Sequence, residues 1–220
     1  MRRADFARTR TPLVAVTTSS TTPHPAGPVR LTVAAELPGA VGVERDARDD
    51  SSAAAGVDRA WTPLDGIDML VNHAGLGMRT VDPHVMTRPR GFWEVPVDGF
   101  RAVVETNLTG YFLVAREVVP RTLAAGGGRV VTVSVNHETM RRAGFVPYGP
   151  SRAGRESLSR IMAVELRDSG VTVNLLPPEG ATATGMPPAD ALPREPDGPG
   201  AGVMGPRVRW LASGVAASGR

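Results

Sequence analysis

The chain has no cysteine, and all 25 of its basic residues are arginine, so lysine is absent as well. The absence of cysteine excludes disulfide bonds and thiol catalysis, and it fits a protein of the cytoplasm. The sequence also lacks an apolar run of about 18 residues, so it predicts no transmembrane helix. The arginines are scattered, and the formal net charge is only +3. We therefore expect neither a nucleic acid nor a membrane as a partner.

A length of 220 residues with 41% hydrophobic residues predicts a single α/β domain that can bury a large core. Residues 1–32 are the least readable part of the chain. Within them Leu13–Val16 favours a short strand, and the polar residues that follow favour a loop or a weakly ordered segment. The apolar patch behind the N-terminal arginines is too short for a secretory signal, so we expect no signal peptide. The predicted domain therefore covers residues 33–220.

Two β-branched runs, Val130–Val133 and Val171–Leu176, predict two strands in the second half of the chain. A helical pattern separates them, and the order strand, helix, strand predicts a doubly wound parallel α/β sheet of the Rossmann-like kind. A strand within Gly66–Gly75 and a strand at Val41–Val43 that ends near Asp46 fit the same sheet. Functional groups of such sheets gather where the strands end.

The clearest helical pattern has Asp98 as its expected N-cap and apolar residues at helical spacing from Phe100 to Val119. Asn107 falls on the same apolar face, where a buried amide needs hydrogen-bond partners. A second helix is predicted from Tyr148 onwards. Its buried residues are expected to be Leu158, Ile161, Met162 and Leu166.

Polar residues at the start of this second helix suggest acid–base chemistry. Tyr148 and Arg152 are four residues apart, which puts both side chains on one face of the helix. A phenol beside a fixed cation is a candidate proton donor, because the positive charge favours the phenolate. Ser134 ends the preceding strand, so its hydroxyl is expected near the same edge of the sheet.

The chain resembles the short-chain dehydrogenase/reductase family over roughly residues 33–217, most firmly from Asp65 to Met186. Six segments occur in the family's order and spacing. They are VNHAG at Val71–Gly75, Asn107 in ETNLTGYF, Ser134 at a strand end, YGPSR at Tyr148–Arg152, Val173–Asn174 before Pro178, and Thr184–Met186.

The resemblance implies an NAD(P)-dependent oxidoreductase that transfers hydride between nicotinamide and a small alcohol or carbonyl compound. It implies Tyr148 as the acid/base and a homo-oligomer formed through two long helices, at Phe100–Leu123 and Tyr148–Asp168. It does not distinguish NAD from NADP, and it implies no metal. The catalytic residues implied are Asn107, Ser134, Tyr148 and Arg152, and the cofactor-binding residues are Asp46, Asn72, Ala74, Gly75, Tyr148, Arg152 and Thr184.

Three departures from the family pattern suggest an alternative. The glycine-rich TGxxxGxG loop is missing, Arg152 stands where the family has lysine, and the chain stops before the family's final strand. We therefore expect a degenerate N-terminal glycine motif and a shortened C-terminus, with an incomplete first βα unit and no last strand. The alternative function is a catalytically impaired or non-catalytic relative that binds the cofactor weakly or not at all.

Some candidate residues also have simpler interpretations. Asp46 lies in the acidic stretch DARDD, which equally fits a solvated surface. His137 follows Ser134 by three residues, but no G-x-S-x-G motif surrounds that serine, so a Ser-His hydrolase is not favoured. His73 is expected to be a turn residue.

Overall fold

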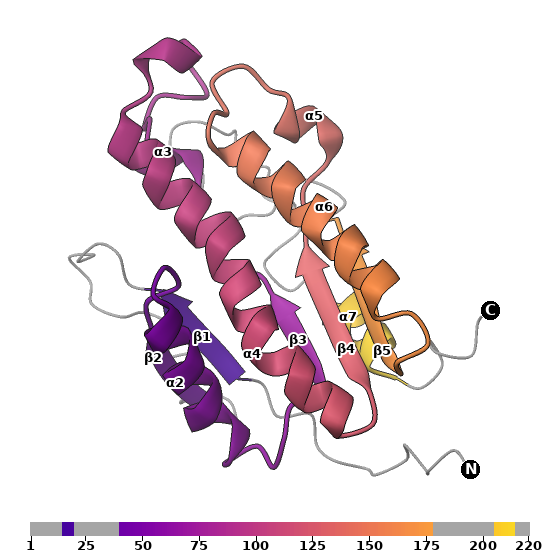
Figure 1. Cartoon of the computed structure of the whole chain (residues 1–220). Helices are drawn as coiled ribbons and strands as arrows, with labels where there is room; N and C mark the ends of the chain where they lie inside the picture. The colour runs from indigo at the N-terminus through magenta and orange to yellow at the C-terminus, as the bar shows by residue number, and fades with distance from the viewer. Residues whose placement is uncertain (1–14, 20–39, 178–204, 214–220) are drawn as a thin grey trace.

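The computed structural model describes residues 15–19, 40–177 and 205–213. Figure 1 shows parallel strands with long helices packed over one face of the sheet. The described strands are β1 (Ala15–Ser19), β2 (Val41–Arg45), β3 (Met69–Asn72), β4 (Gly128–Val133) and β5 (Val171–Leu176).

All backbone pairing between these strands is parallel, as predicted. β3, β4 and β5 form one ladder, in which Leu70 is paired with Val130 and Val130 with Val173. β1 and β2 form a second ladder, and no strand pairing joins the two ladders among the described residues. The predicted bounds of β5 are confirmed, and β4 begins two residues earlier than the β-branched run suggested.

The first strand differs from the sequence prediction. β1 begins at Ala15 and pairs with β2, and Figure 1 shows it on the side of β2 that faces β3. In a doubly wound sheet the first strand pairs with both the second and the fourth strands. In the described part of the chain, β1 has only one such neighbour. The stretch expected in place of the glycine-rich loop begins at Thr17. Its first three residues, expected to be a loop, belong to β1, and the rest lies outside the described residues.

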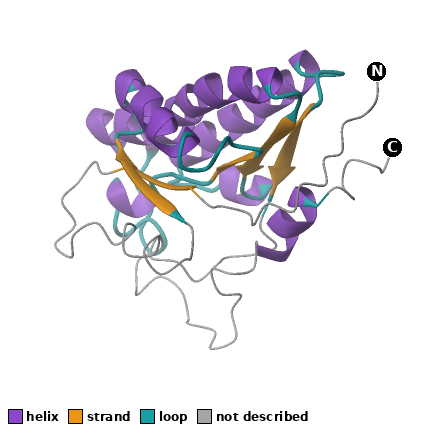
Figure 2. Ribbon diagram, turned by 90° about the horizontal axis from the view of Figure 1, so that it is seen from below, coloured by secondary structure: helices purple, strands orange, loops and turns teal. Residues whose placement is uncertain are grey.

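The helices lie mainly on one side of the sheet. Figures 1 and 2 show α2, α4 and α6 over one face and α7 on the other. The described helices are α2 (Asp50–Trp61), α3 (Val97–Val104), α4 (Gly110–Ala124), α5 (His137–Met140), α6 (Tyr148–Glu165) and α7 (Gly205–Ala212), with short 3₁₀ turns η1 (Met78–Thr80) and η2 (Phe92–Glu94). None of the helices in these described ranges is long and apolar enough to cross a membrane.

The long predicted helix is interrupted by a π-helical turn. α3 is followed by η3 (Glu105–Thr109), a π-helix, and then by α4. Such turns insert extra backbone into a helix and are frequent at functional sites. The predicted N-cap is wrong, because Pro96 caps α3 and Asp98 lies in its first turn. Proline is compatible with this position, because the residue before the helix has an extended backbone and its missing N–H is not required for a helical hydrogen bond.

Alternating strand residues supply two separate cores. Val130 packs with Tyr111 of α4 and the apolar side of α6, whereas Val131 packs with Leu211 of α7. This follows from the strand period of two, which points neighbouring side chains to opposite faces. β4 therefore lies between helices on both sides and is the centre of the described three-stranded ladder.

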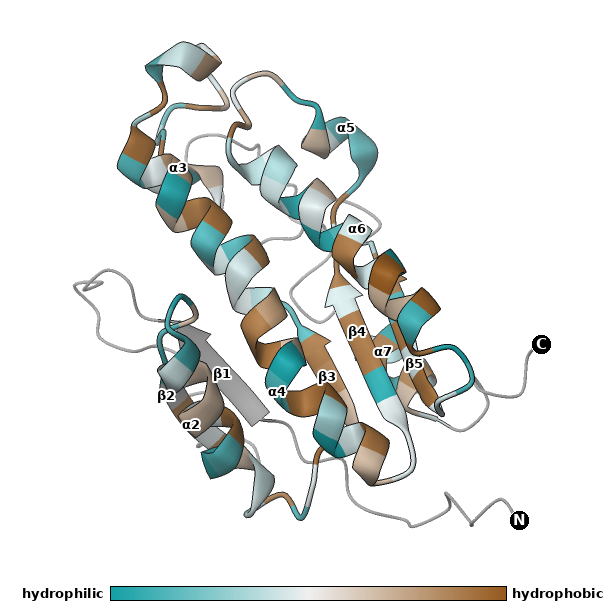
Figure 3. Cartoon of the chain, in the orientation of Figure 1, coloured by the Kyte–Doolittle hydropathy of each residue, from teal (hydrophilic) through white to brown (hydrophobic). Residues whose placement is uncertain are grey.

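The outer face of α6 is more apolar than the sequence pattern suggested. Ile161, which we expected to be buried, is 51% exposed, and Val164 is 61% exposed. Figure 3 shows hydrophobic residues along the outward sides of α4 and α6, where Phe112 is 45% exposed. Leu158, Met162 and Leu166 are partly buried against the sheet, as predicted. The helix thus has apolar residues on both of its sides.

The variant Val131→Ala is expected to lower the free energy of unfolding by about 1–3 kcal/mol, measured by urea denaturation. Val131 is fully buried between β4 and α7, so truncation leaves a cavity. Val97→Ala is the matched control, because Val97 is 62% exposed and its truncation should cost less than about 0.5 kcal/mol. Equal losses in the two variants would contradict this assignment of the core.

Candidate active site

Asn107 joins three parts of the chain at the carboxyl edge of the sheet. It lies in the π turn η3 and has no exposed surface. Its Oδ1 accepts a hydrogen bond from the Leu76 backbone N–H at 2.7 Å, and its Nδ2 donates to the Leu76 carbonyl at 3.0 Å. Nδ2 also donates to Ser151 Oγ at 3.3 Å. The amide therefore fixes the loop after β3 against the first turn of α6.

Tyr148 and Arg152 lie on one face of α6, as their spacing predicted. Tyr148 is 6% exposed and packs against Val103 and Met78. The Arg152 guanidinium carbon lies 4.9 Å from the centre of the Tyr148 ring, within the range of a cation–π contact. Arg152 Nη1 also donates to the Val133 carbonyl at 3.3 Å. The cation is thus held beside both the phenol and the end of β4.

Ser134 directly follows β4 and is buried. Its backbone N–H donates to the Leu176 carbonyl at 3.1 Å, which anchors it between two strand ends. Its hydroxyl donates to Glu156 Oε1. Glu156 also accepts a hydrogen bond from Arg160 Nη2 at 2.9 Å. The proton of the serine hydroxyl therefore already has a carboxylate partner.

The sequence analysis missed Glu156 as part of this site. It lies on α6, eight residues after Tyr148 and four after Arg152, and is buried beside the sheet. Residues spaced by four share a helix face, so the position could have been included with the other two. This spacing was the available signal, together with Arg160 four residues further on as a partner for the carboxylate.

Arg155 is a second buried residue that the sequence analysis missed. It is 1% exposed, and it donates to the Ala74 carbonyl at 3.4 Å and to the Val133 carbonyl. Burial lowers the pKa of Arg155 to about 9, and the positive charge of Arg152 contributes to the shift. Two guanidinium groups thus bind the carbonyl that precedes Ser134. This contact ties α6 to the ends of β3 and β4.

Gly75 lies where these groups approach one another most closely. A Cβ at this position would be 2.8 Å from Asn107 Oδ1 and 2.9 Å from Arg152 Nη2. Any side chain there would collide with both, so glycine is required by space. The backbone of the turn after β3 can therefore lie directly against Asn107 and Arg152.

The residues expected to bind a dinucleotide are only partly brought together. Asn72 ends β3 and is buried, with no hydrogen-bond partner for its Nδ2 among the described residues. Asp46 follows β2, but its carboxylate is bound by Arg48, and these hydrogen bonds lower the pKa of Asp46. Ala74 and Gly75 form the turn after β3, and Thr184 lies outside the described residues.

Three of the residues expected at the cofactor site offer features that a ligand can use. The cradle at Gly75, the unpartnered amide of Asn72 and the cation of Arg152 lie at one edge of the sheet. Among residues 15–19, 40–177 and 205–213, no group of three or more histidine or acidic side chains is placed to hold a metal ion.

Comparisons with known proteins agree with the fold. A solved structure of a gluconate 5-dehydrogenase from Burkholderia cenocepacia, in complex with NADP and tartrate, matches with a TM-score of 0.63. At 21% identity it covers 77% of this chain and 62% of that chain, and it shows the fold alone.

Curated relatives agree as well. Nodulation protein G of Azospirillum brasilense is 32% identical over 135 residues, which is 61% of this chain and 51% of that protein. The 2-dehydro-3-deoxy-L-rhamnonate dehydrogenase (NAD(+)) of Sphingomonas sp. is 32% identical over 136 residues, or 62% and 51%. The chain thus spans about half the length of these two relatives. A family model described as short chain dehydrogenase matches residues 19–191. The chain belongs to the short-chain dehydrogenase/reductase family.

Proposed function

We propose that the protein is an NAD(P)-dependent oxidoreductase that interconverts a small alcohol and a carbonyl compound, with Tyr148 as the acid/base. The observation that carries the proposal is the convergence of distant segments. Asn107 contacts Ser151 in the first turn of α6, and Arg152 contacts both Tyr148 and the end of β4 beside Ser134. A phenol, a cation and a hydroxyl at one sheet edge suit the transfer of a proton to and from an alkoxide.

The cofactor would lie along the same edge. When bound, NAD(P) accepts or supplies the hydride that chemistry at the substrate carbon requires. Its binding residues in this proposal are Asp46, Asn72, Ala74, Gly75, Tyr148 and Arg152, with Thr184 as a further candidate in the part of the chain not described.

Proton transfer in this proposal depends on Tyr148 and Arg152. During alcohol oxidation the phenolate oxygen of Tyr148 takes the hydroxyl proton of the substrate while the carbinol hydride leaves. Arg152 lies over the ring and places a positive charge beside the phenol. Unlike lysine, a guanidinium keeps its own proton at any ordinary pH, so Arg152 acts as a fixed charge and does not relay protons.

Ser134 is placed to hydrogen-bond the substrate oxygen. Its hydroxyl donates to Glu156 in the structure, and the single proton of an alcohol hydroxyl goes to Tyr148 in this proposal. We therefore propose that Ser134 turns its proton from Glu156 to the substrate oxygen when the substrate binds, and that Glu156 holds the serine hydroxyl in place until then.

Replacing the only other tyrosine provides a matched control for Tyr148. Tyr148→Phe is expected to lower kcat about 10²- to 10⁴-fold, because the proton donor is lost. Activity would be measured by the absorbance of NADH or NADPH with small primary and secondary alcohols. Tyr111→Phe removes an equally buried phenol, one that hydrogen-bonds to Ser159 at 3.0 Å.

The Tyr111→Phe protein should keep its kcat while it loses about 1 kcal/mol of folding stability. Full activity in the Tyr148→Phe protein would rule out Tyr148 as the acid/base.

Glu156→Gln tests the orientation of Ser134. The variant replaces a charge-assisted hydrogen bond with a weaker neutral one, so the Ser134 hydroxyl is held less firmly. We expect the KM for the alcohol to rise about 3- to 10-fold, with unchanged affinity for NAD(P)H. The control is Glu138→Gln, which removes an exposed carboxylate paired with Arg141. An unaltered KM in the Glu156→Gln protein would contradict the proposal that Glu156 orients the Ser134 hydroxyl.

We also propose that the protein self-associates through the outward faces of α4 and α6. Phe112, Ile161 and Val164 are 45%, 51% and 61% exposed on these helices, and large exposed apolar groups on neighbouring helices favour an interface. Both helices are long enough to pair with copies of themselves in a symmetric contact.

The double variant Ile161→Asp/Val164→Asp should therefore shift the protein toward the monomer. Light scattering coupled to size-exclusion chromatography measures the mass directly. Val97→Asp is the control, because Val97 is 62% exposed but belongs to α3, so its replacement should leave the mass unchanged. An oligomer that survives the double variant would place the interface elsewhere.

A further inference from the structure

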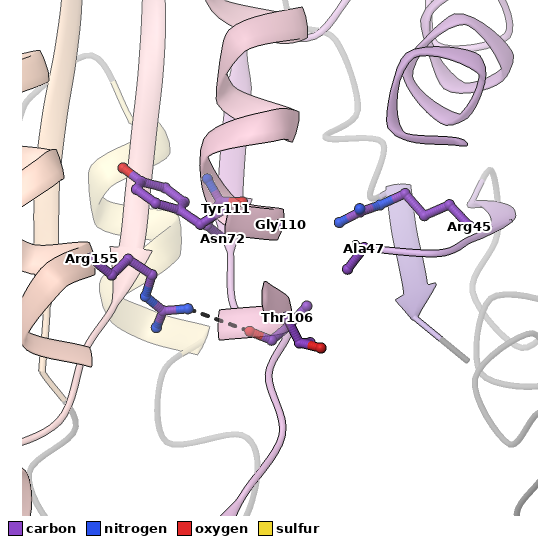
Figure 4. Close-up of a pocket in the computed structure, with 8 residues that line it drawn as sticks. Arg45, Ala47, Asn72, Thr106, Gly110, Tyr111 and Arg155 are labelled. Atoms are coloured by element: carbon purple, nitrogen blue, oxygen red, sulfur yellow. Dashed lines mark hydrogen bonds between the residues drawn. The ribbon is translucent and has the colours of Figure 1, made fainter. Parts of the chain in front are cut away.

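A small polar cavity lies between β2, β3, α4 and α6, beside the candidate active site. Figure 4 shows Arg45 and Arg155 reaching toward it from opposite sides, with Asn72 and Thr106 between them. The cavity has a volume of about 10 Å³, which is room for one water-sized particle. Its lining shares Asn72 and Ala74 with the proposed cofactor site, but Arg45 and Arg155 have no part in the reaction proposed above and need their own explanation.

The side chains that line this cavity have unused hydrogen-bond donors. Arg45 Nε and Nη1, Asn72 Nδ2 and Arg155 Nε are buried and have no hydrogen-bond partner among the described residues. Their residues are 6%, 8% and 1% exposed. Each of these atoms is a nitrogen that can only donate. A buried donor without an acceptor is costly, so unpartnered donors from three residues around one cavity indicate an acceptor inside it.

The lining also carries positive charge without a matching carboxylate. Arg45 and Arg155 are the charged residues around the cavity, and no acidic residue lines it in the described part of the chain. Asp46 is next to Arg45 in sequence, but its two oxygens are bound by Arg48 at 3.2 and 3.0 Å. Glu156 is bound by Ser134 and Arg160. Both nearby carboxylates are therefore engaged elsewhere.

The fold makes room for Arg45 in this position. Its side chain crosses α2 at Gly56, where a Cβ would lie 3.2 Å from Arg45 Cδ. Burial lowers the pKa of Arg45 and of Arg155, which shows that the surroundings disfavour their charges as they stand. A negative charge between the two groups would relieve this cost.

We propose that this cavity is a binding site for one small monovalent anion of the size of chloride. The guanidinium groups of Arg45 and Arg155 and the amide of Asn72 donate to it, and its size favours a monatomic ion over phosphate or a carboxylate. The anion offsets one of the two buried positive charges, reduces their mutual repulsion and joins β2 to α6. Its role is to stabilise the fold, and it does not depend on the proposed oxidoreductase activity.

Thermal unfolding in different sodium salts tests the proposal. Chloride and bromide are compared with gluconate at equal ionic strength, so that general screening is held constant. Chloride at about ten times its dissociation constant raises the ratio of folded to unfolded protein about eleven-fold, a rise of roughly 3–6 °C in Tm. Arg45→Met should abolish the difference between the salts, whereas Arg116→Met, which removes an exposed arginine on α4, should keep it.

Chloride-35 NMR gives a second measurement on the unaltered protein, in case Arg45→Met fails to fold. Site binding predicts excess line broadening that grows with protein concentration, falls as chloride saturates the site and is reversed by bromide. A Tm that is the same in chloride and gluconate, together with no excess broadening, would overturn the proposal and leave one water molecule as the occupant. An equal salt effect in the Arg45→Met protein would overturn it as well.

Discussion

The hydrogen bonds between the Asn107 side chain and the backbone of Leu76 are the constraint on which the site depends. The Asn107 carboxamide accepts from the N–H of Leu76 and donates to its carbonyl, as a paired β-strand would. These two bonds fix the chain just after β3. A third hydrogen bond, from Asn107 to the Ser151 hydroxyl, connects the same amide to α6. Because Asn107 is fully buried, losing any of these bonds leaves polar groups without water to replace them.

The π turn is what brings this amide to the required place. An ordinary helix from Val97 to Ala124 would keep Asn107 in register with its apolar neighbours. The wider turn at Glu105–Thr109 changes that register and directs a polar side chain at a backbone loop. Gly75 completes the arrangement, since any larger residue there would displace Asn107 and Arg152. One helical irregularity and one glycine thus allow Asn107 and Arg152 to lie against the turn after β3.

Much of this arrangement could be predicted from the sequence, because it depends on local periodicity. The β-branched runs at β4 and β5 and the four-residue spacing of Tyr148 and Arg152 each need only neighbours along the chain. Glu156 and Arg155 were missed because their burial depends on the sheet below α6, which a helical pattern does not reveal. Ile161 was expected to be buried because apolar residues occur on both sides of that helix. The N-cap was predicted at Asp98 and not at Pro96, because aspartate is a stronger capping signal than proline.

The most direct test of the central claim is a calorimetric titration of the protein with NADH and with NADPH. The arrangement of Asn107, Arg152 and Gly75 at the ends of the strands predicts saturable binding of at least one of them, with a dissociation constant of about 1 μM to 1 mM. Binding of neither cofactor at millimolar concentration would contradict the account and favour a family member without catalytic activity.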